Sequence, residues 1–227
     1  MKRILRRVYH LFCDRFLSLM DMIVDLRVCG RSLVKYVPSI DRDNQKKLGG
    51  TGSQSTHYCL LRRIFSHVTL TEEDAVLDVG CGKGRVLAFL LREKCPCRLY
   101  GVEHNPKVAR IAADWSQRYD RVTVFTGDAF SLDCNPYTVL TLARSFLSET
   151  FIAFVEQLEQ TMTHPVRLVS WYDQQEARRL KGRPGWTLAY REVVDRIHGI
   201  PVSYYPQAFS VWTFDPAKRQ EQAETTE

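Results

Sequence analysis

One aspartate and three alternating glycines form the segment whose residue types and spacing point most clearly to chemistry: Asp78, Gly80, Gly82 and Gly84. They follow an apolar run and lead into a helical pattern over 84–93, so the segment predicts a strand, a glycine turn and a helix. Glycines let such a turn approach a ligand closely at the carboxyl edge of a parallel sheet, where open α/β folds bind small molecules. The carboxylate of Asp78 would repel phosphate groups and would pair with an ammonium group.

The same turn excludes two common nucleotide-binding motifs. A triphosphate-binding loop requires Gly-x-x-x-x-Gly-Lys followed by Ser or Thr, whereas here Lys83 follows Gly82 and is itself followed by Gly84. A dinucleotide-binding turn requires a third glycine three positions after the second, and Arg85 occupies that place. We therefore expect a ligand without a pyrophosphate at this turn.

Two more acidic residues follow the next two expected strands. Glu103 ends the run 98–103, about 20 residues beyond the glycines, where a carboxylate can accept hydrogen bonds from both hydroxyls of a ribose. Asp128 follows the run 122–126, within the sequence Gly-Asp-Ala. Both acids are expected at the same sheet edge as Asp78.

These three segments resemble those of class I S-adenosylmethionine-dependent methyltransferases. In that family the first strand reads approximately D-x-G-x-G-x-G, the second ends in an acidic residue, and the third is followed by Gly-Asp-Ala. The resemblance covers residues 56–171 and implies S-adenosylmethionine as the cofactor, whose methionine part carries an ammonium group for Asp78. The cofactor-binding residues that it implies are Thr56, Asp78, Gly80, Cys81, Gly82, Gly84, Glu103, His104, Asp128 and Ala129.

By the same resemblance, Glu103 binds the ribose, Asp128 contacts the adenine amino group, and the backbone amide of Ala129 contacts a ring nitrogen. His104 is expected beside the adenine, and an exposed histidine at a helix start is the alternative. For Asp128 the alternative is a turn or a helix cap.

Thr56 enters the site through a second likeness. Segment 52–58 resembles that of small stand-alone bacterial methyltransferases, which are distantly related to the non-SET histone lysine methyltransferase fold. In those relatives a Tyr-x-x-Thr arrangement touches the methionine end of the cofactor. Here Ser53 stands in the place of the tyrosine, and Thr56 is the candidate contact.

The acceptor site departs from the family pattern. The fourth strand of the family often ends in Asn-Pro-Phe or Asp-Pro-Pro-Tyr, which holds an amino nitrogen, but residues 142–146 read Leu-Ala-Arg-Ser-Phe. This argues against methylation of an exocyclic base amine. Arg144 is a candidate to bind a carboxylate or phosphate of the substrate, or else an exposed arginine that leads into a helix. Tyr172 is a candidate base or pocket residue, or else packs at the end of the sheet.

Three functions are compatible with these residues. The leading hypothesis is S-adenosylmethionine-dependent methyl transfer to a small molecule or a protein side chain. The second is an RNA-directed methyltransferase or RNA-binding module, for which Lys2, Arg3, Arg6 and Arg7 would be an electrostatic anchor. The third is a non-catalytic cofactor-binding or scaffolding protein, which the departure at residues 143–146 suggests.

The elements that position these residues alternate along the chain. Strands are expected at 75–79, 98–103, 122–126, 137–142, 166–171, 186–197 and 202–214. Helices are expected at 56–67, with Thr56 as N-cap, and at 84–93, 106–118 and 147–162. This βαβ rhythm requires a parallel sheet with helices on both faces. We predict a Rossmann-like α/β fold with a mostly parallel seven-stranded sheet, an antiparallel C-terminal edge hairpin and an extra N-terminal helix.

That N-terminal helix is expected over Ile4–Leu26 and should be amphipathic. Its apolar residues recur at spacings of three and four, and this stripe is expected to pack on the main domain. The stripe comprises Leu5, Val8, Phe12, Phe16, Leu19, Ile23 and Leu26. Contact with a membrane surface is the weaker alternative, because Asp14, Asp21 and Asp25 would be repelled by an anionic surface.

Length and composition indicate one globular domain with short extensions. The chain has 227 residues, 44% hydrophobic and 26% charged, which is ordinary for a folded protein. We expect the N-terminal helix and a loop or lid over 1–55, the methyltransferase domain over 56–215 and a disordered acidic tail over 216–227.

The net charge and the cysteine content limit which partners and which cellular compartment we expect. The formal net charge of +6 is modest, so nucleic acid is not the favoured partner. Seven cysteines without zinc-type spacing predict a reducing cytoplasm and no metal site. No stretch approaches the roughly 20 apolar residues of a transmembrane helix. The oligomeric state is left open.

Overall fold

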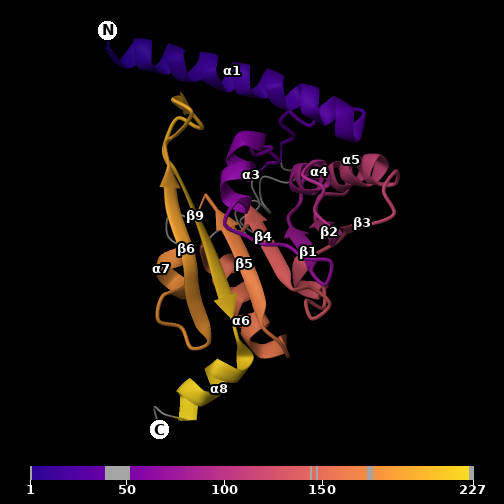
Figure 1. The fold of residues 1–227 in the computed structure, drawn as a ribbon, viewed down its shortest axis with the longest axis vertical. Coiled ribbons are helices and arrows are strands. Elements are labelled where there is room, and N and C mark those ends of the chain that lie inside the picture. The colour runs from indigo at the N-terminus through magenta and orange to yellow at the C-terminus, as the bar shows by residue number, and fades with distance from the viewer. Residues whose placement is uncertain (1, 39–51, 144, 147, 173–175, 225–227) are drawn as a thin grey trace.

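The computed structural model of the chain describes residues 2–38, 52–143, 145–146, 148–172 and 176–224. Its strands are β1 (Ala75–Val79), β2 (Arg98–Glu103), β3 (Val122–Thr126), β4 (Val139–Ala143), β5 (Val166–Trp171), β6 (Trp186–Val194), β7 (Arg196–Ile197), β8 (Ile200–Pro201) and β9 (Gln207–Phe214). Its helices are α1 (Lys2–Cys29), α3 (Tyr58–Phe65), α4 (Arg85–Arg92), α5 (Pro106–Ser116), the 3-10 helix η1 (Ala129–Ser131), α6 (Ser148–Thr161), α7 (Glu176–Leu180) and α8 (Pro216–Glu224). Figure 1 shows α1 lying across one end of the molecule and α8 at the other.

A seven-stranded sheet in the order β3-β2-β1-β4-β5-β9-β6 forms the centre of the molecule. β1 pairs in parallel with β2 and β4, whereas β9 pairs antiparallel with both β5 and β6. The predicted mixed sheet is therefore confirmed, and β9 of the C-terminal hairpin inserts between β5 and the edge strand β6. The strand order reverses between β1 and β4, and such a switch point opens a crevice at the carboxyl ends of the strands.

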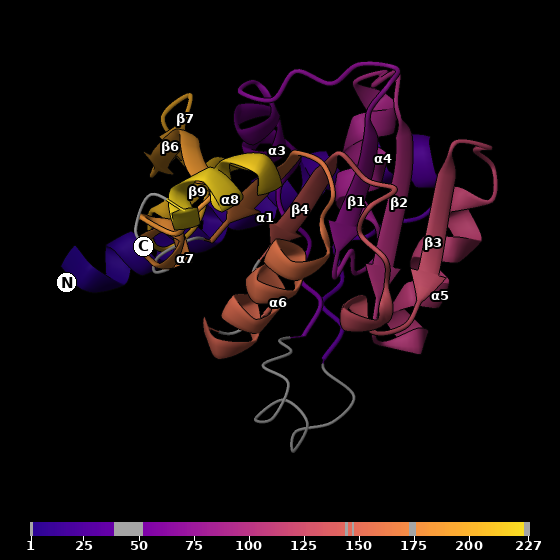
Figure 2. The same cartoon turned by 90° about the horizontal axis from the view of Figure 1, so that it is seen from below.

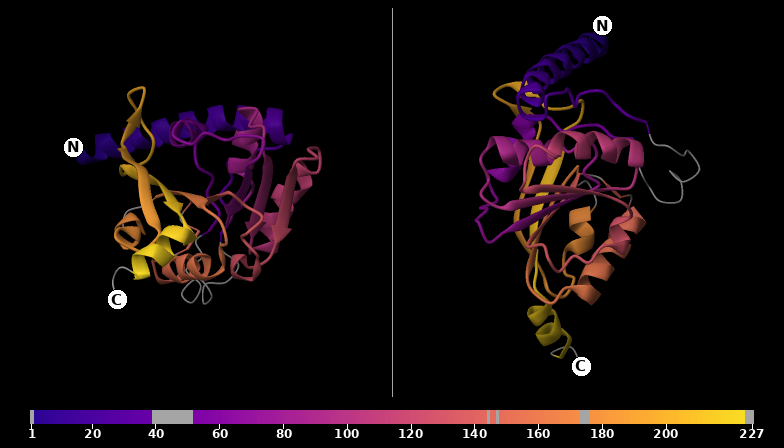
Figure 3. Two further views of the ribbon diagram at one scale, coloured as in Figure 1. Left: turned by 60° about the horizontal axis from the view of Figure 1, so that its bottom comes forward. Right: turned by 90° about the vertical axis from the view of Figure 1, so that its right-hand side faces the viewer.

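Helices cover both faces of the sheet. α3, α4 and α5 lie on one face and α6 and α7 on the other (Figure 2, Figure 3). Val76, Leu77 and Val79 of β1 are all buried, as expected for a central parallel strand that is covered on both sides. Asp78 is the one polar residue of this strand, and it is buried as well.

α1 packs on the domain through the face opposite to the one predicted. The whole apolar stripe of this helix is exposed, with exposed fractions between 38% and 69%. The buried positions are instead His10, Cys13, Leu17, Asp21, Asp25 and Cys29. The prediction that the stripe packs on the domain is therefore wrong.

A buried ion-pair cluster explains this orientation of α1. Arg85 at the start of α4 is only 4% exposed, and its guanidinium nitrogens lie 2.9 Å from Asp21 Oδ2 and 2.6 Å from Asp25 Oδ2. Removing one partner of a buried pair leaves an uncompensated charge in the interior, which is strongly unfavourable. The helix therefore buries Asp21 and Asp25 and leaves its apolar stripe exposed.

The first residue of α3 also differs from the prediction. Thr56 is not the N-cap, because α3 begins at Tyr58 and His57 takes the N-cap position without a side-chain cap bond. The cap comes from a distant helix: Asp21 Oδ1 of α1 accepts the Tyr58 backbone N–H at 3.2 Å. A cap supplied from 37 residues away leaves no local sequence signal.

The C-terminal segment forms helix α8 where we predict a disordered tail. Asp215 Oδ1 accepts the backbone N–H of Ala217 at 3.0 Å, and Pro216 occupies the first helical position, a combination that favours a helix start. Residues 225–227 and most of the expected glycine-rich loop, 39–51, lie outside the described residues. Across the described ranges, no helix has both the length and the apolar content that crossing a bilayer requires.

Candidate functional site

The glycine turn lies at the switch point of the sheet, where β1 and β4 end side by side. Gly80, Gly82 and Gly84 have φ angles of 70°, 57° and 84°, in the left-handed region that favours glycine. A Cβ atom on Gly80 would lie 2.7 Å from the side chain of Ser145, and one on Gly82 would lie 2.7 Å from Ser53 Oγ. Both backbone conformation and close packing therefore require glycine in this turn.

Asp78 is buried directly before this turn. Thr141 of β4 is its register partner and donates from Oγ1 to Asp78 Oδ1 at 2.7 Å. Asp78 Oδ2 has no hydrogen-bond partner among the described residues. Burial raises the pKa of Asp78 to about 7, although the Thr141 hydrogen bond lowers it, and nearby Glu103 raises it further. A buried carboxylate oxygen without a donor is costly, so this atom is suited to a cationic ligand.

The turn is held against the end of β2 by backbone hydrogen bonds. The N–H groups of Gly80 and Cys81 donate to the Val102 carbonyl at 2.8 and 2.9 Å. Cys81 is buried, and its sulfur would lie 2.8 Å from a Cβ atom on Gly101. Cys81 therefore helps to seat the turn on β2.

Glu103 joins the turn to the start of α5. Its Oε2 accepts the Gly82 backbone N–H at 2.9 Å and its Oε1 accepts the Asn105 backbone N–H at 2.8 Å. Burial raises the pKa of Glu103, while the hydrogen bonds from these two amides lower it. Each carboxylate oxygen has two lone pairs, so Glu103 retains acceptor capacity for ligand hydroxyls at the same sheet edge as Asp78.

The other predicted contacts lie after β2 and β3. His104 is exposed and Ala129 is buried. Asp128 is exposed and caps η1, because its Oδ1 accepts the Phe130 backbone N–H at 3.0 Å. The cap considered as the alternative for Asp128 is thus present. It uses one of the two carboxylate oxygens and leaves the other for an adenine amino group.

Thr56 is tied to the end of β5. Its Oγ1 accepts the indole N–H of Trp171 at 3.0 Å, and its carbonyl accepts a hydrogen bond from Arg85 at 3.4 Å. Thr56 is buried, so these bonds give it a structural role whatever its role toward a ligand. Tyr172 follows β5 with a φ of 60° and is half-buried. Arg144, the other acceptor candidate, lies outside the described residues.

Two residues of β4 and its following loop belong to the site although we did not predict them. Thr141 is the only hydrogen-bond partner found for the Asp78 side chain within the described ranges. Ser145 donates from Oγ to the Val79 carbonyl, directly beside Gly80. A lone threonine within the apolar run of β4 was the available signal for Thr141.

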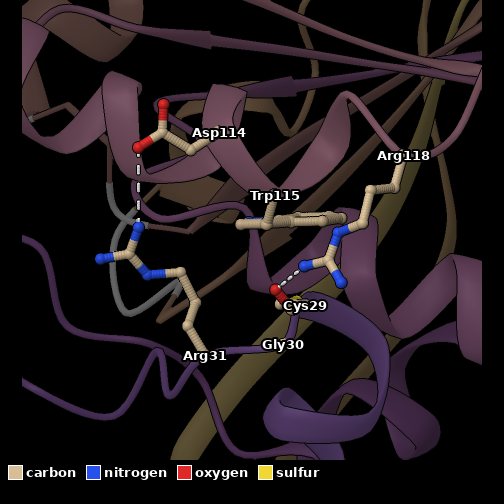
Figure 4. Close-up of a pocket in the computed structure, with 6 residues that line it drawn as sticks. All are labelled: Cys29, Gly30, Arg31, Asp114, Trp115 and Arg118. Carbon is tan, nitrogen blue, oxygen red and sulfur yellow. Dashed lines mark hydrogen bonds and ion pairs between the residues drawn. The ribbon is translucent and has the colours of Figure 1, made fainter.

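A separate hollow of about 380 Å³ lies behind the turn, between the end of α1 and α5 (Figure 4). An ion pair of 3.7 Å joins Arg31 to Asp114 across it, and Arg118 donates to the Cys29 carbonyl. Trp115 forms one wall and donates from Nε1 to the carbonyl of Lys83 at 2.9 Å. None of the predicted cofactor contacts lines this hollow, and its bonds fasten α1 to the domain.

Known proteins match the part of the chain that carries the turn. Residues 76–165 match the family model described as a methyltransferase domain. This part of the chain resembles class I S-adenosylmethionine-dependent methyltransferases. The chain is 33% identical over 89 residues to erythromycin 3''-O-methyltransferase of Saccharopolyspora erythraea, covering 38% of this chain and 29% of that protein. It is 25% identical over 114 residues to a protein-lysine N-methyltransferase of Saccharolobus islandicus, covering 49% of this chain and 70% of that protein.

Solved structures agree on the fold. An RNA methyltransferase of Salinibacter ruber, in complex with S-adenosyl-L-homocysteine, has a TM-score of 0.54 at 21% identity and covers 71% of this chain and 94% of its own. Magnesium protoporphyrin IX methyltransferase of Synechocystis PCC 6803, with bound S-adenosylmethionine, has a TM-score of 0.52 at 16% identity, covering 69% and 76%. At these identities the likeness concerns the fold.

Proposed function

We propose that this methyltransferase transfers a methyl group from S-adenosylmethionine to a small molecule or a protein side chain. One observation carries the proposal: Asp78 is a buried carboxylate with a donor-free oxygen, placed beside a glycine turn at the switch point of the sheet. The methionine ammonium of the cofactor supplies both the positive charge and the donors that this oxygen lacks.

The neighbouring residues fit the rest of the same molecule. Glu103 has lone pairs for the ribose hydroxyls, and Asp128 and Ala129 at the end of β3 are suited to the adenine. His104 is exposed next to Glu103, where it can flank the adenine ring. Gly80, Cys81, Gly82 and Gly84 line the methionine side, together with Thr56.

The chemistry requires little of the protein beyond positioning. When bound, S-adenosylmethionine supplies an electrophilic methyl group on a sulfonium sulfur, which keeps the bonding electron pair when the methyl group leaves. The residues of the chain hold this group in line with the acceptor atom, and alignment of this kind can account for about 7 to 11 kcal/mol of barrier lowering. Tyr172, which follows β5, is our candidate to shape the acceptor side or to take the proton of the acceptor.

Residues 142–146, at the end of β4 and directly after it, and the relatives support the proposed acceptor class. Residues 142–146 lack the motif that holds an exocyclic base amine. One relative acts on erythromycin and another on protein lysine, so a small molecule or a protein is favoured over a nucleic acid. RNA is the alternative, supported by the basic start of α1 and by the RNA methyltransferase with the same fold.

Labelling with a tritiated methyl donor tests these assignments. The protein is incubated with the donor and a cell lysate, which is then separated into protein, RNA and metabolites. We expect label in the protein or metabolite fraction, and much less of it with Asp78→Asn at a donor concentration below the dissociation constant of the variant. Label in RNA supports the alternative acceptor. If no fraction supports conversion of the donor to S-adenosylhomocysteine, methyl transfer is contradicted and the scaffolding alternative is favoured.

The cysteines support a cytoplasmic location as part of this proposal. All seven are free thiols, and six of them are buried. Burial raises the pKa of Cys29 to about 12 and of Cys134 to about 11, which keeps these thiols protonated and unreactive. Free thiols in this number suit a reducing compartment.

A further inference from the structure

The outward face of α1 is a continuous apolar surface. Its seven stripe residues recur at spacings of three and four over more than five turns, and every one is exposed. Phe12 is 69% exposed, although a phenylalanine of a globular domain is usually buried. Leu11 and Met20 widen the same surface. A patch of this extent on one helix marks a contact with a partner or a membrane.

The acidic residues of α1 do not share this face. Asp21 and Asp25 are buried against Arg85. Asp14 lies 3.4 Å from Nε2 of His57, whose Nδ1 contacts Asp21 at 2.7 Å. The three carboxylates that argued against a membrane surface therefore point at cationic groups of the domain and not at the apolar stripe.

Exposed cationic residues flank the apolar face instead. At 3.6 residues per turn, Arg15 and Arg27 border the stripe on its two sides, and both are exposed. Arg7 is exposed near the start of the helix, where Lys2, Arg3 and Arg6 add further positive charge. Near the N-terminal half of α1, the ring of Tyr204 packs on His10 with 5.2 Å between centroids. The adjacent Tyr205 is 65% exposed, and aromatic side chains with a polar tip suit a membrane interface.

We propose that α1 docks this protein on an anionic lipid surface, with the helix lying in the plane of the membrane. An apolar face bounded by cationic residues is the pattern that binds acyl chains and anionic headgroups together. A second copy of the chain fits less well, because pairing two α1 faces brings their arginines together, while Asp21 and Asp25 are buried against Arg85 and Asp14 contacts His57. Docking through α1 is separate from cofactor binding, since none of the predicted cofactor contacts lies on this helix.

Co-sedimentation with vesicles tests the docking surface on the full chain. We expect binding to vesicles of equal parts phosphatidylcholine and phosphatidylglycerol, at least tenfold weaker binding to phosphatidylcholine alone, and a loss of binding at high salt. The double variant Phe12→Glu/Leu19→Glu should bind the anionic vesicles at least tenfold more weakly. Both side chains are exposed, so circular dichroism should show an unchanged fold.

The matched control is Leu188→Glu/Val193→Glu on β6, which replaces two other exposed apolar side chains with the same charge change. This control should bind anionic vesicles like the wild type. Absence of binding to anionic vesicles overturns the proposal, as does an equal loss in the control. A dimer in light scattering that Phe12→Glu/Leu19→Glu dissociates, without vesicle binding, assigns the face to a second copy. Salt-sensitive RNA binding without vesicle binding assigns it to RNA.

Discussion

The burial of Asp78 predicts a pH-dependent stability that one substitution removes. Burial raises the pKa of Asp78 from 3.8 to about 7 in the folded protein. Between these values the folded chain holds a proton that the unfolded chain has released. The contribution of Asp78 to the free energy of unfolding is therefore greatest at low pH and falls as the pH rises from about 4 through about 7.

The magnitude follows from the two pKa values. Each pKa unit corresponds to 1.36 kcal/mol, so a difference of about three units amounts to roughly 4 kcal/mol once Asp78 is fully ionised. Roughly 2 to 3 kcal/mol of this is lost between pH 5 and pH 8. Asp78→Asn keeps an acceptor for Thr141 and does not titrate, so the variant should not lose this amount. Its amide donor near the position of Oδ2 adds a cost of roughly 1 to 3 kcal/mol that is the same at both pH values.

Urea unfolding of the cofactor-free protein at pH 5 and pH 8 measures this effect, with tryptophan fluorescence as the signal, since Trp115, Trp171, Trp186 and Trp212 are all buried. The stability of Asp78→Asn relative to wild type should rise by roughly 2 to 3 kcal/mol from pH 5 to pH 8. Groups that titrate elsewhere cancel in this comparison. A relative stability that is equal at the two pH values would refute the reasoning, because Asp78 would then titrate normally.

Three further predictions concern the site and its support. Glu103→Ala removes the acceptor of two backbone amides at the turn, so calorimetry should show at least tenfold weaker S-adenosylmethionine binding, and wild-type affinity would contradict its place in the site. Arg85→Met leaves the buried Asp25 without its cationic partner and Asp21 with His57 alone, and it should cost roughly 3 to 5 kcal/mol in urea unfolding, whereas a cost below about 1 kcal/mol would argue against the ion-pair cluster. Burial lowers the pKa of His57, but hydrogen bonds to two aspartates of α1 outweigh it and raise that pKa from 6.5 to about 9. His57 therefore stabilises the fold below pH 6.5, and this contribution is lost as the pH rises through about 9. The free energy of unfolding of His57→Gln should not fall in this way over the same pH range. An equal fall in wild type and variant would contradict the raised pKa of His57.

The skeleton of the site was predictable because its signals are local. The order of apolar runs and glycines places Asp78 and Glu103 at the ends of β1 and β2, and parallel pairing brings those ends to one edge. The positive φ angles of Gly80 and Gly82 follow from the same pattern. Each of these features depends on residues within a few positions of one another.

The features that escaped prediction depend on distant residues. Thr141 meets Asp78 through strand register, 63 positions apart. The stripe of α1 predicted an apolar face correctly but not its direction, because Arg85, 60 positions after Asp25, recruits the opposite face. Thr56 is held by Trp171, 115 positions away. Periodicity identifies which faces exist, whereas long-range charge pairing decides which of them is buried.

A binding comparison with two ligands at pH 8 tests the central claim most directly. S-adenosylmethionine carries the methionine ammonium, whereas methylthioadenosine keeps the ribose and adenine without it. Since a charge-assisted hydrogen bond contributes roughly 1.5 to 3 kcal/mol, Asp78→Asn should weaken S-adenosylmethionine binding at least tenfold in calorimetry and leave methylthioadenosine affinity unchanged. Equal weakening of both ligands, or of neither, would contradict the pairing of Asp78 with the cofactor ammonium.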